Sequence, residues 1–361
     1  MKLAVVVGTR PNFVKAAAVI SAFARRGVVV DVIHTGQHHD PGMSDAFFSR
    51  FRLPPPAHHL GVTSGMRGEQ LGEIVARLTR LLPAMALDEL LVVGDVTSAA
   101  GGALAADACD LPVAHVEAGL RSFDWTMPEE RNRRIVDAIA WRLLVSEPSG
   151  LQNLVAEGRS GVGVHLVGNV MIDTLFRFRS EAEAARVWDR FGVGRGAYAV
   201  ATLHRPGNVD TKDALDECTT VLAAAAHRYP VLFAAHPRTQ MRLREFGLTL
   251  PDAVRVLAPL DYLDFISLMA GAAVVLTDSG GAQEETTALG VPCLTMRKNT
   301  ERPITCELGS SRLVARSIEL VETAFADIDA GTYPRGQEIP LWDGNAADRI
   351  AEIILAEPPR R

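Results

Sequence analysis

The segment Leu276–Pro303, LTDSGGAQEETTALGVPCLTMRKNTERP, decides how the rest of the chain is interpreted. It starts at the end of an apolar run that predicts a buried parallel strand, and a tight Ser279-Gly280-Gly281 turn follows. Ala282–Leu289 then predicts a helix that ends at Gly290. Such a turn presents backbone N–H groups at a helix N-terminus, where the helix dipole favours a bound diphosphate. The alternative is an ordinary strand–turn–helix connection with nothing bound.

Two acidic residues, Glu284 and Glu285, fall in the first turn of this predicted helix. A carboxylate in that position can accept hydrogen bonds from a ribose diol. The pattern is less specific than a P-loop, and no GxxxxGK[ST] sequence occurs in the chain.

Length and composition predict a two-domain globular protein. At 361 residues the chain exceeds one typical core, and 48% hydrophobic with 22% charged residues is a globular composition. The net charge of -6 argues against nucleic acid or an anionic membrane as partner. The 4 cysteines have no CxxC spacing, so neither a disulfide framework nor a zinc site is predicted. The N-terminus resembles a first strand more than a signal peptide, and we expect a cytoplasmic protein without a membrane span.

Short apolar strands alternate with amphipathic helices, a pattern that predicts βαβ units and parallel sheets. The first domain is expected at residues 1–172 and the second at 173–344, with a polar helix at 172–190 leading from one into the other. The predicted strands are 3–7, 28–34, 90–93, 113–116, 143–145 and 165–167, then 198–203, 231–235, 254–257, 273–277 and 292–295. Helices are expected at 13–25, at 69–82 ending before Pro83, and at 345–356 capped by Asn345. Parallel sheets bind ligands at the carboxyl ends of their strands, so the cleft between the domains is the expected site.

The motif GTRPN follows the first strand and opens a helix. Gly8 permits a sharp turn, Arg10 is then aimed at a diphosphate, and Lys15 adds charge one turn later. The alternative is an ordinary loop with a surface arginine.

Carboxylates follow the third and fourth predicted strands of the first domain, as Asp95 in VVGDVTS and Glu117 in HVEAGLRS. Glu129 and Glu130 then begin the helix after Pro128. Carboxylates that converge on one cleft suit proton transfer, because their environments can separate their pKa values. Helix capping is the alternative for Asp95 and Glu129. Arg121 is expected either to pair with Glu117 or to bind ligand.

Histidines end two neighbouring strands of the second domain, as His204 in HRPGN and His236 in HPR. They indicate phosphate binding or catalysis more than metal binding, because neither His204 nor His236 belongs to an HxxxH pair. The pairs His38-His39 and His58-His59 are the weaker metal alternative, and no metal is predicted. Phe265 can stack a base or simply belong to the core, and Arg302 is a second candidate phosphate or sugar contact.

Together these motifs resemble the non-hydrolysing UDP-N-acetylglucosamine 2-epimerases. The matching segments are GTRPNFVK, TGQHHD, VVGDVTS, HVEAGLRS, MPEERNRR, HRPGNVD and Leu276–Pro303, in order over nearly the whole chain. The resemblance implies an α/β fold class of two Rossmann-like domains in a glycosyltransferase-B arrangement, with residues 345–361 packing back on the first domain. It also implies a homodimer that binds a UDP-sugar and needs no cofactor.

The family's reaction inverts C2 of UDP-GlcNAc to give UDP-ManNAc through elimination of UDP and its re-addition to 2-acetamidoglucal. The resemblance implies that Asp95, Glu117, Glu129 and His204 are catalytic. It implies that UDP is bound by Arg10, Ser279, Gly280, Gly281, Glu285 and Arg302 and, less directly, by Phe265 and His236, while the residue patterns add Lys15 and Arg121 as substrate contacts.

The sequence departs from the family pattern at Asn12 and Gly207, where many members have glutamate. The stretch from Gly119 to Pro128 is also shorter than in many members. A different UDP-aminosugar, a hydrolysing relative that releases UDP and ManNAc, a glycosyltransferase and a non-catalytic binding protein therefore stay as alternatives. A dinucleotide oxidoreductase is disfavoured because no GxGxxG follows a strand.

Overall fold

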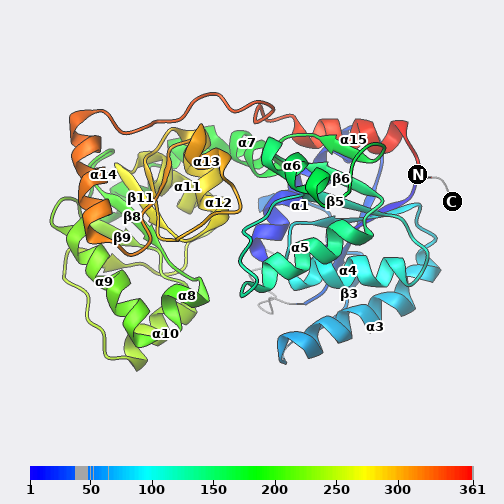
Figure 1. Ribbon diagram of the computed structural model, residues 1–361, viewed down its shortest axis with the longest axis horizontal. Helices are drawn as coiled ribbons and strands as arrows, with labels where there is room; N and C mark the ends of the chain where they lie inside the picture. The colour runs from blue at the N-terminus through cyan, green and yellow to red at the C-terminus, as the bar shows by residue number, and fades with distance from the viewer. Residues whose placement is uncertain (37–47, 49, 52, 64, 360–361) are drawn as a thin grey trace. The chain divides into compact units, whose positions relative to one another are not determined.

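The structure is a computed structural model that describes residues 1–36, 48, 50–51, 53–63 and 65–359, apart from the side chain of Arg10. The chain divides into two compact units (Figure 1). Unit 1 comprises Met1–Thr174 and Pro340–Arg361, and unit 2 comprises Leu175–Ile339.

Unit 1 is built on a parallel sheet of seven strands in the order β3-β2-β1-β4-β5-β6-β7. The strands are β1 (Leu3–Val7), β2 (Val30–His34), β3 (His58–His59), β4 (Glu89–Val93), β5 (Val113–Ala118), β6 (Arg142–Val145) and β7 (Val164–Leu166). Its central strands are apolar on both sides because helices cover both faces of a parallel sheet.

The helices of unit 1 divide between the two faces. They are α1 (Arg10–Arg25), α3 (Arg67–Met85), α4 (Thr97–Asp107), α5 (Pro128–Ile139), α6 (Pro148–Ala156), α7 (Val170–Ala185, which continues into unit 2) and α15 (Ala346–Ala356). One core joins α3, α4, α5 and α6 to one face of the sheet. Figure 1 shows α15, the last helix of the chain (red), which packs beside α1 of the same unit.

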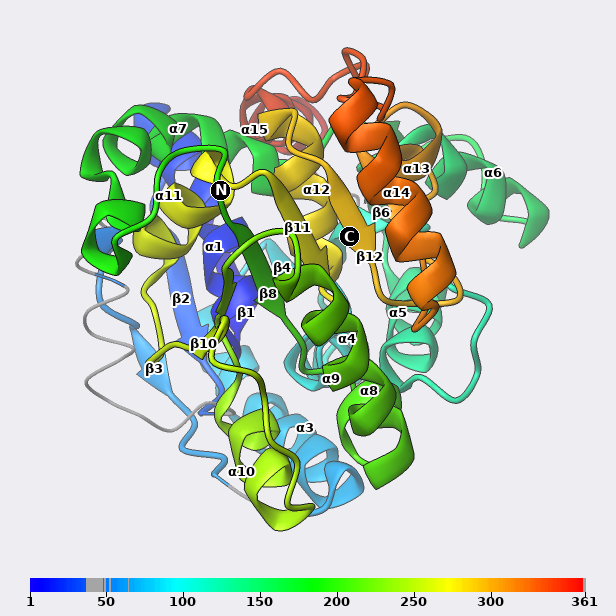
Figure 2. The same cartoon turned by 90° about the vertical axis from the view of Figure 1, so that its left-hand side faces the viewer.

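Unit 2 repeats this plan with six parallel strands in the order β10-β9-β8-β11-β12-β13. The strands are β8 (Ala199–Thr202), β9 (Val231–Phe233), β10 (Val254–Val256), β11 (Val274–Thr277), β12 (Cys293–Thr295) and β13 (Ser311–Leu313). The helices are the 3-10 turn η1 (Val187–Phe191), α8 (Pro206–Val209), α9 (Lys212–Ala226), α10 (Pro237–Glu245), α11 (Tyr262–Gly271), α12 (Gly280–Leu289), α13 (Ile304–Glu307) and α14 (Ile318–Ala330). Figure 2 looks onto this unit, where α9 and α14 share one apolar core with the sheet.

The predicted fold class of two Rossmann-like domains is confirmed, since both sheets contain the strand order 3-2-1-4-5-6 of a doubly wound fold when counted within each unit, and unit 1 adds a seventh strand at its edge. Every predicted strand is present to within a few residues. Two further strands, β3 (HH) and β13 (SRL), escaped prediction because neither contains an apolar run.

Three local predictions are wrong. Helix α3 continues through Pro83 to Met85, because a proline in the last turn removes only one late hydrogen bond, and Ala86 ends the helix in a left-handed conformation. The helix expected at 172–190 stops at Ala185, where Arg186 has a φ of 44°. Strand β5 extends beyond Val116 through a register shift that takes in Glu117.

The predicted cap of α15 by Asn345 is wrong, because a residue distant in sequence caps this helix. Asn345 precedes the helix, but its side chain makes no cap hydrogen bond and donates instead to the carbonyl of Asp343. The carboxylate of Asp173 accepts from the N–H groups of Ala346 at 3.1 Å and Ala347 at 2.6 Å. Burial raises the pKa of Asp173 to about 6, against the effect of these hydrogen bonds.

In the part of the chain that the structure describes, no helix is both long and apolar enough to cross a membrane.

Candidate active site

Each sheet has one point where the strand order reverses direction. In unit 1 it lies between β1 and β4, and in unit 2 between β8 and β11. Loops at such a switch point diverge to opposite faces of the sheet and leave a crevice at the carboxyl ends of the strands. Arg10, Asp95, His204 and Ser279 each follow one of these four strands, so the predicted site residues gather at the two switch points.

The β1–α1 turn of unit 1 is held by close packing and by one buried amide. A Cβ atom on Gly8 would lie 1.9 Å from Ser98 Oγ, so only glycine fits there. Asn12 Oδ1 accepts from the N–H of Gly8 at 3.0 Å, and Nδ2 donates to the carbonyl of Val93 at 2.6 Å. A glutamate could not make the second bond, so the departure at Asn12 has a structural use in tying β1 to β4. The Arg10 side chain lies outside the described part.

Glu117 is held in a strained conformation against a buried cation. Its φ of 74° is in the left-handed region, which costs a non-glycine residue roughly 1–3 kcal/mol. The carboxylate forms an ion pair with Lys15 Nζ, and only 10% of the Lys15 side chain and 5% of the Glu117 side chain are exposed. A Cβ atom on Gly94 would lie 3.2 Å from Glu117 Oε2. The structure thus brings together Lys15, Gly94 and Glu117 at the ends of β4 and β5.

Asp95 is paired with Arg133, a residue that the sequence did not single out. The buried Arg133 guanidinium bridges Asp95 and Glu130, and Asn132 Nδ2 donates to the carbonyl of Asp95 at 2.7 Å. Arginine suits this position because its planar fork can serve two carboxylates.

The two glutamates at the start of α5 have different environments. Glu130 is fully buried and accepts from the Ser122 N–H at 2.8 Å and from Ser122 Oγ at 2.9 Å. Burial raises the pKa of Glu130, but the Ser122 and Arg133 hydrogen bonds outweigh it and hold that pKa below its ordinary value. Glu129 is half-buried beside it. Glu130 therefore has a structural role, and the catalytic role of Glu129 stays a prediction.

A buried carboxylate, Asp137, fixes the turn that follows Glu117. It accepts from Gly119 N–H at 3.1 Å and from Arg121 Nη1 at 2.7 Å, and it lies 2.6 Å from His115 Nδ1. Burial raises the pKa of Asp137, but its interactions with His115 and Arg121 outweigh this and lower it. His115 Nε2 in turn lies 3.0 Å from the carbonyl of Gly94, so Asp137 supports both strand ends.

Arg121 is used inside unit 1. Its guanidinium pairs with Asp137 and with Glu157, the latter at 2.6 Å, and its side chain has no exposed surface. The alternative that Arg121 pairs with Glu117 is therefore wrong, because Lys15 takes that place. Ligand binding by Arg121 stays a prediction.

In unit 2 the Ser279-Gly280-Gly281 turn forms the N-terminus of α12, as predicted. Ser279 Oγ caps the helix by accepting from the Ala282 N–H at 3.4 Å. The first turn of a helix leaves its N–H groups without intrahelical partners, so those of Gly280 and Gly281 can donate hydrogen bonds to a bound anion. A Cβ atom on Gly280 would lie 2.5 Å from Arg302 Nη1. Arg302 therefore packs directly on this turn.

Arg302 belongs to a buried cluster of alternating charges. Its Nε donates to Glu284 Oε1 at 2.5 Å and its Nη1 lies 2.8 Å from Glu301 Oε1. Glu301 also pairs with Arg297 at 2.7 Å and Arg205 at 3.2 Å. Glu301 is thus a shared anchor that the sequence did not reveal as such.

Three further predicted residues lie around α10, α11 and α12. Glu285 is buried beside the Tyr262 hydroxyl, and burial together with the Glu285 charge raises the pKa of Tyr262 well above its ordinary value. Phe265 is half-buried on α11, which packs against α12. His236 precedes α10, and its Nδ1 accepts from the Arg238 N–H at 3.2 Å, so it caps that helix.

His204 lies against Asp278, which is fully buried at the end of β11. Asp278 Oδ1 is 3.1 Å from His204 Nδ1, and the carboxylate also accepts from the N–H groups of His204 at 3.1 Å and Arg205 at 2.9 Å. Burial raises the pKa of Asp278, but His204 and these donors outweigh it and lower it.

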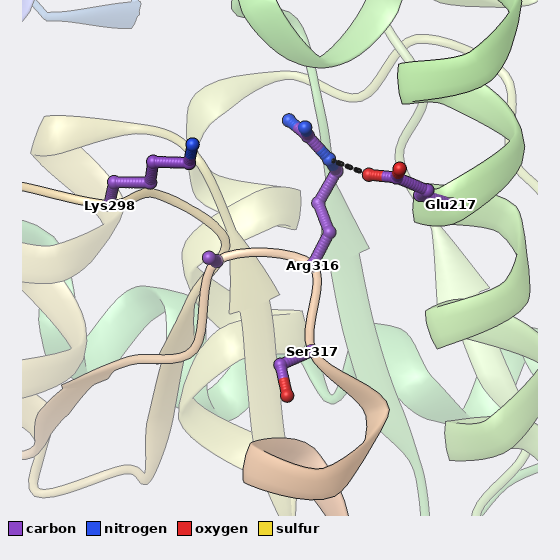
Figure 3. Close-up of a pocket in the computed structure, with 5 residues that line it drawn as sticks. Glu217, Lys298, Arg316 and Ser317 are labelled. Atoms are coloured by element: carbon purple, nitrogen blue, oxygen red, sulfur yellow. Dashed lines mark hydrogen bonds and ion pairs between the residues drawn. The ribbon is translucent and has the colours of Figure 1, made fainter.

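A shallow hollow of about 380 Å³ lies next to α8 and is lined by Glu217, Lys298, Ala315, Arg316 and Ser317. Figure 3 shows Arg316 extended toward Glu217. Arg316 Nη1 also donates to the carbonyl of Gly207 at 3.3 Å and to Asn208 Oδ1 at 3.1 Å. Gly207, at the position where the family often has glutamate, therefore accepts a hydrogen bond from Arg316 through its backbone carbonyl.

Within the described residues no group of three or more histidine, cysteine, aspartate or glutamate side chains is arranged to hold a metal ion. His58 and His59 form the short edge strand β3, and His38 and His39 lie outside the described residues.

Two Rossmann-like units, one with carboxylates clustered at its switch point and one with a helix N-terminus available to an anion, fit the class of nucleotide-binding α/β proteins. A model of the UDP-N-acetylglucosamine 2-epimerase family matches residues 21–355, and the chain belongs to this family. The resemblance predicted from the sequence motifs is confirmed.

Individual relatives match over almost their whole length. The UDP-N-acetylglucosamine 2-epimerase of Methanocaldococcus jannaschii is 35% identical, covering 98% of this chain and 99% of the relative. The crystal structure of that archaeal enzyme in complex with UDP-GlcNAc and UDP matches with a TM-score of 0.92 over 99% of this chain and 100% of that one. The UDP-2,3-diacetamido-2,3-dideoxy-D-glucuronate 2-epimerase of Pseudomonas aeruginosa is also 35% identical, covering 98% of this chain and 99% of the relative.

Proposed function

We propose that the protein is a non-hydrolysing epimerase that interconverts UDP-N-acetylglucosamine and UDP-N-acetylmannosamine. Family membership supports this proposal, as do the similar archaeal enzyme and its complex with UDP-GlcNAc and UDP. The observation that carries it is the conformation of Glu117. Backbone strain at a buried carboxylate, paired with Lys15 and covered by Gly94, is expected where a functional group must be held in place.

The chemistry explains why carboxylates and a diphosphate site are needed together. The C2 proton of the sugar has no adjacent carbonyl and is not acidic by itself. When the C1–O bond to UDP breaks, C1 gains positive character and a base can remove the C2 proton, leaving UDP and 2-acetamidoglucal. A proton then returns to C2 on the opposite face while UDP adds back to C1, so atoms and charge balance over the cycle.

The carboxylates of unit 1 supply the proton transfers in this proposal. Asp95, Glu117 and Glu129 form a shared acid–base set, in which Asp95 is paired with Arg133 and Glu117 with Lys15. One member removes the C2 proton and another returns it on the other face.

The groups of unit 2 stabilise UDP as the leaving group. The free N–H groups of Gly280 and Gly281 and the Arg302 guanidinium suit a diphosphate, and Glu285 suits the ribose hydroxyls. His204 assists departure of the diphosphate or transfers a proton.

A second candidate substrate is UDP-2,3-diacetamido-2,3-dideoxy-D-glucuronate. It is favoured by the Pseudomonas aeruginosa relative, which has the same 35% identity as the archaeal one. The same elimination and re-addition would invert C2 of this sugar.

Proton NMR in D2O with each UDP-sugar tests both candidates. Deuterium at C2 and a new anomeric signal for the C2 epimer are expected with the true substrate. Accumulation of free UDP and free sugar would instead identify a hydrolase. Binding of UDP without any turnover of either sugar would refute the epimerase proposal.

A further inference from the structure

We propose that Asp278 is a positioning residue that fixes His204 in one orientation and one tautomer. As far as turnover is concerned, this inference rests on the proposed function. Neither residue needs a ligand to meet the other, because both lie at the switch point of unit 2, at the ends of the paired strands β8 and β11.

The Asp278 carboxylate is completely buried, and its two oxygens are occupied differently. Oδ1 is 3.1 Å from the imidazole Nδ1 of His204. Oδ2 accepts from the N–H of His204 at 3.1 Å, from the N–H of Arg205 at 2.9 Å and from Asn208 Nδ2 at 3.1 Å. The His204 N–H is shared, since it also lies 3.1 Å from Oδ1.

This arrangement selects the tautomer of His204. An ionised carboxylate only accepts hydrogen bonds, and the His204 and Arg205 donors keep the pKa of Asp278 below its ordinary value. The proton of a neutral imidazole must then sit on Nδ1. Within the described part of the chain Nε2 has no hydrogen-bond partner, and the His204 side chain is 41% exposed. His204 can therefore take up or deliver a proton through Nε2, while Nδ1 stays bonded to Asp278.

Asn208 prevents the carboxylate from turning. Its Nδ2 donates both to Asp278 Oδ2 and to the carbonyl of Met296 at 2.9 Å, while its Oδ1 accepts from Arg316 at 3.1 Å. The orientation of Asp278 is thus fixed from the side opposite His204.

The change Asp278→Asn has a definite expected effect. Three N–H donors face the Oδ2 position, so the amide oxygen should settle there and the NH2 group should face His204 Nδ1. Nδ1 must then accept, and the proton of His204 moves to Nε2. Long-range proton–nitrogen NMR above neutral pH reports this exchange, with the His204 signals assigned by their absence in His204→Gln.

Kinetics separate positioning from a purely structural role. We expect kcat to fall by about 100-fold or more in Asp278→Asn, while the dissociation constant of UDP changes little. In a His204→Gln background the same change should alter kcat by less than about 3-fold, because Asp278 acts through His204. Asp210→Asn is the matched control. Asp210 follows α8, forms an ion pair with the partly exposed side chain of Arg238, and its replacement should leave kcat unchanged.

Two results would overturn the proposal. One is a wild-type His204 that carries its proton on Nε2, and this measurement needs no variant and decides the matter even if Asp278→Asn does not fold. The other is an equal loss of kcat from Asp278→Asn with and without His204. If the wild-type protein epimerises neither sugar but shows the Nδ1–H tautomer, the proposed function fails and the positioning of His204 by Asp278 stands.

Discussion

Replacing Asp137 with asparagine should destabilise unit 1 far more than the loss of a surface charge does. Asp137 is 1% exposed and is the common partner of His115, Gly119 and Arg121. The amide keeps the shape of the carboxylate, and its oxygen can still accept from Arg121 and Gly119. What is lost is the negative charge beside a buried guanidinium.

The expected magnitude follows from that difference. Removing one partner of a buried ion pair costs about 3–5 kcal/mol, because the remaining charge stays buried without compensation. Arg121 keeps Glu157, and the amide oxygen keeps the hydrogen bonds, so we expect the lower end, about 3 kcal/mol. The control Asp348→Asn also breaks ion pairs of unit 1, with Arg25 and Arg26, but these are surface pairs and should cost about 0–1 kcal/mol.

The assay must resolve the two units, because a two-domain chain need not unfold in one transition. Amide hydrogen exchange over a urea series, read by mass spectrometry, does so. Peptides from α5 report unit 1, and peptides from α9 report unit 2 as an internal reference. We expect the free energy of unfolding to fall in unit 1 only, and by several times the decrease caused by Asp348→Asn.

The same variant should also lower turnover, because Asp137 holds Gly119 directly and Gly94 through His115. These residues flank the strained Glu117, which can relax when they loosen. Equal free energies of unfolding for Asp137→Asn and Asp348→Asn would refute the reasoning, since Asp137 would then contribute no more than a solvated pair.

Three further outcomes are expected. Gly94→Ala should lower kcat with little effect on UDP affinity, because the new Cβ would lie 3.2 Å from Glu117 Oε2. The control is Gly158→Ala, since Gly158 has a similar positive φ but open space around it. This change should cost only backbone strain of about 1 kcal/mol and leave kcat unchanged. Asp173 has a native pKa of about 6, above its unfolded value, so the native state binds more protons between the two. Protonation of Asp173 should therefore contribute up to about 3 kcal/mol to the stability of unit 1 as pH falls from 7 to 4, and hydrogen exchange over a urea series should show that Asp173→Asn lacks this contribution. Arg302→Lys should weaken UDP binding by about 10-fold, measured by calorimetry. A lysine lacks the planar guanidinium that contacts Glu284 and Glu301 while packing on the first turn of α12. Unchanged affinity would show that Arg302 is not part of the UDP site.

The sequence was sufficient to predict every strand except the short β3 and β13, and to predict which edge of each sheet carries the candidate site. A parallel strand is buried on both faces, so runs such as Leu3–Val7 and Val274–Thr277 stand out from the helices between them. Because strand ends follow directly from the strands, Asp95, His204 and Ser279 could be placed at the carboxyl edges of the sheets without a structure.

The supporting residues were not predictable in the same way. Asp137 and His115 are 22 positions apart, and Asp278 and His204 are 74 apart, so no local pattern joins them. The left-handed φ of Glu117 depends on a register shift between β5 and β6, which apolar periodicity does not encode. Asparagine is a residue type that often caps helices, so Asn345 was the expected cap of α15. The fold instead brings Asp173 to the start of this helix, and Asp173 makes the cap.

At both switch points a buried polar side chain connects the ends of two diverging strands, but the two side chains differ in charge. Each must tie the ends of two diverging strands, and each uses one buried polar side chain, Asn12 between β1 and β4 and Asp278 between β8 and β11. The amide of Asn12 is satisfied by backbone groups and adds no charge beside Lys15 and Glu117. The carboxylate of Asp278 instead faces an imidazole, so the tie in unit 2 also directs a titratable group. Under the proposed function Asn12 is compatible with catalysis, because Asp95 and Glu117 are the proposed acid–base residues and the tie between β1 and β4 needs only a donor and an acceptor.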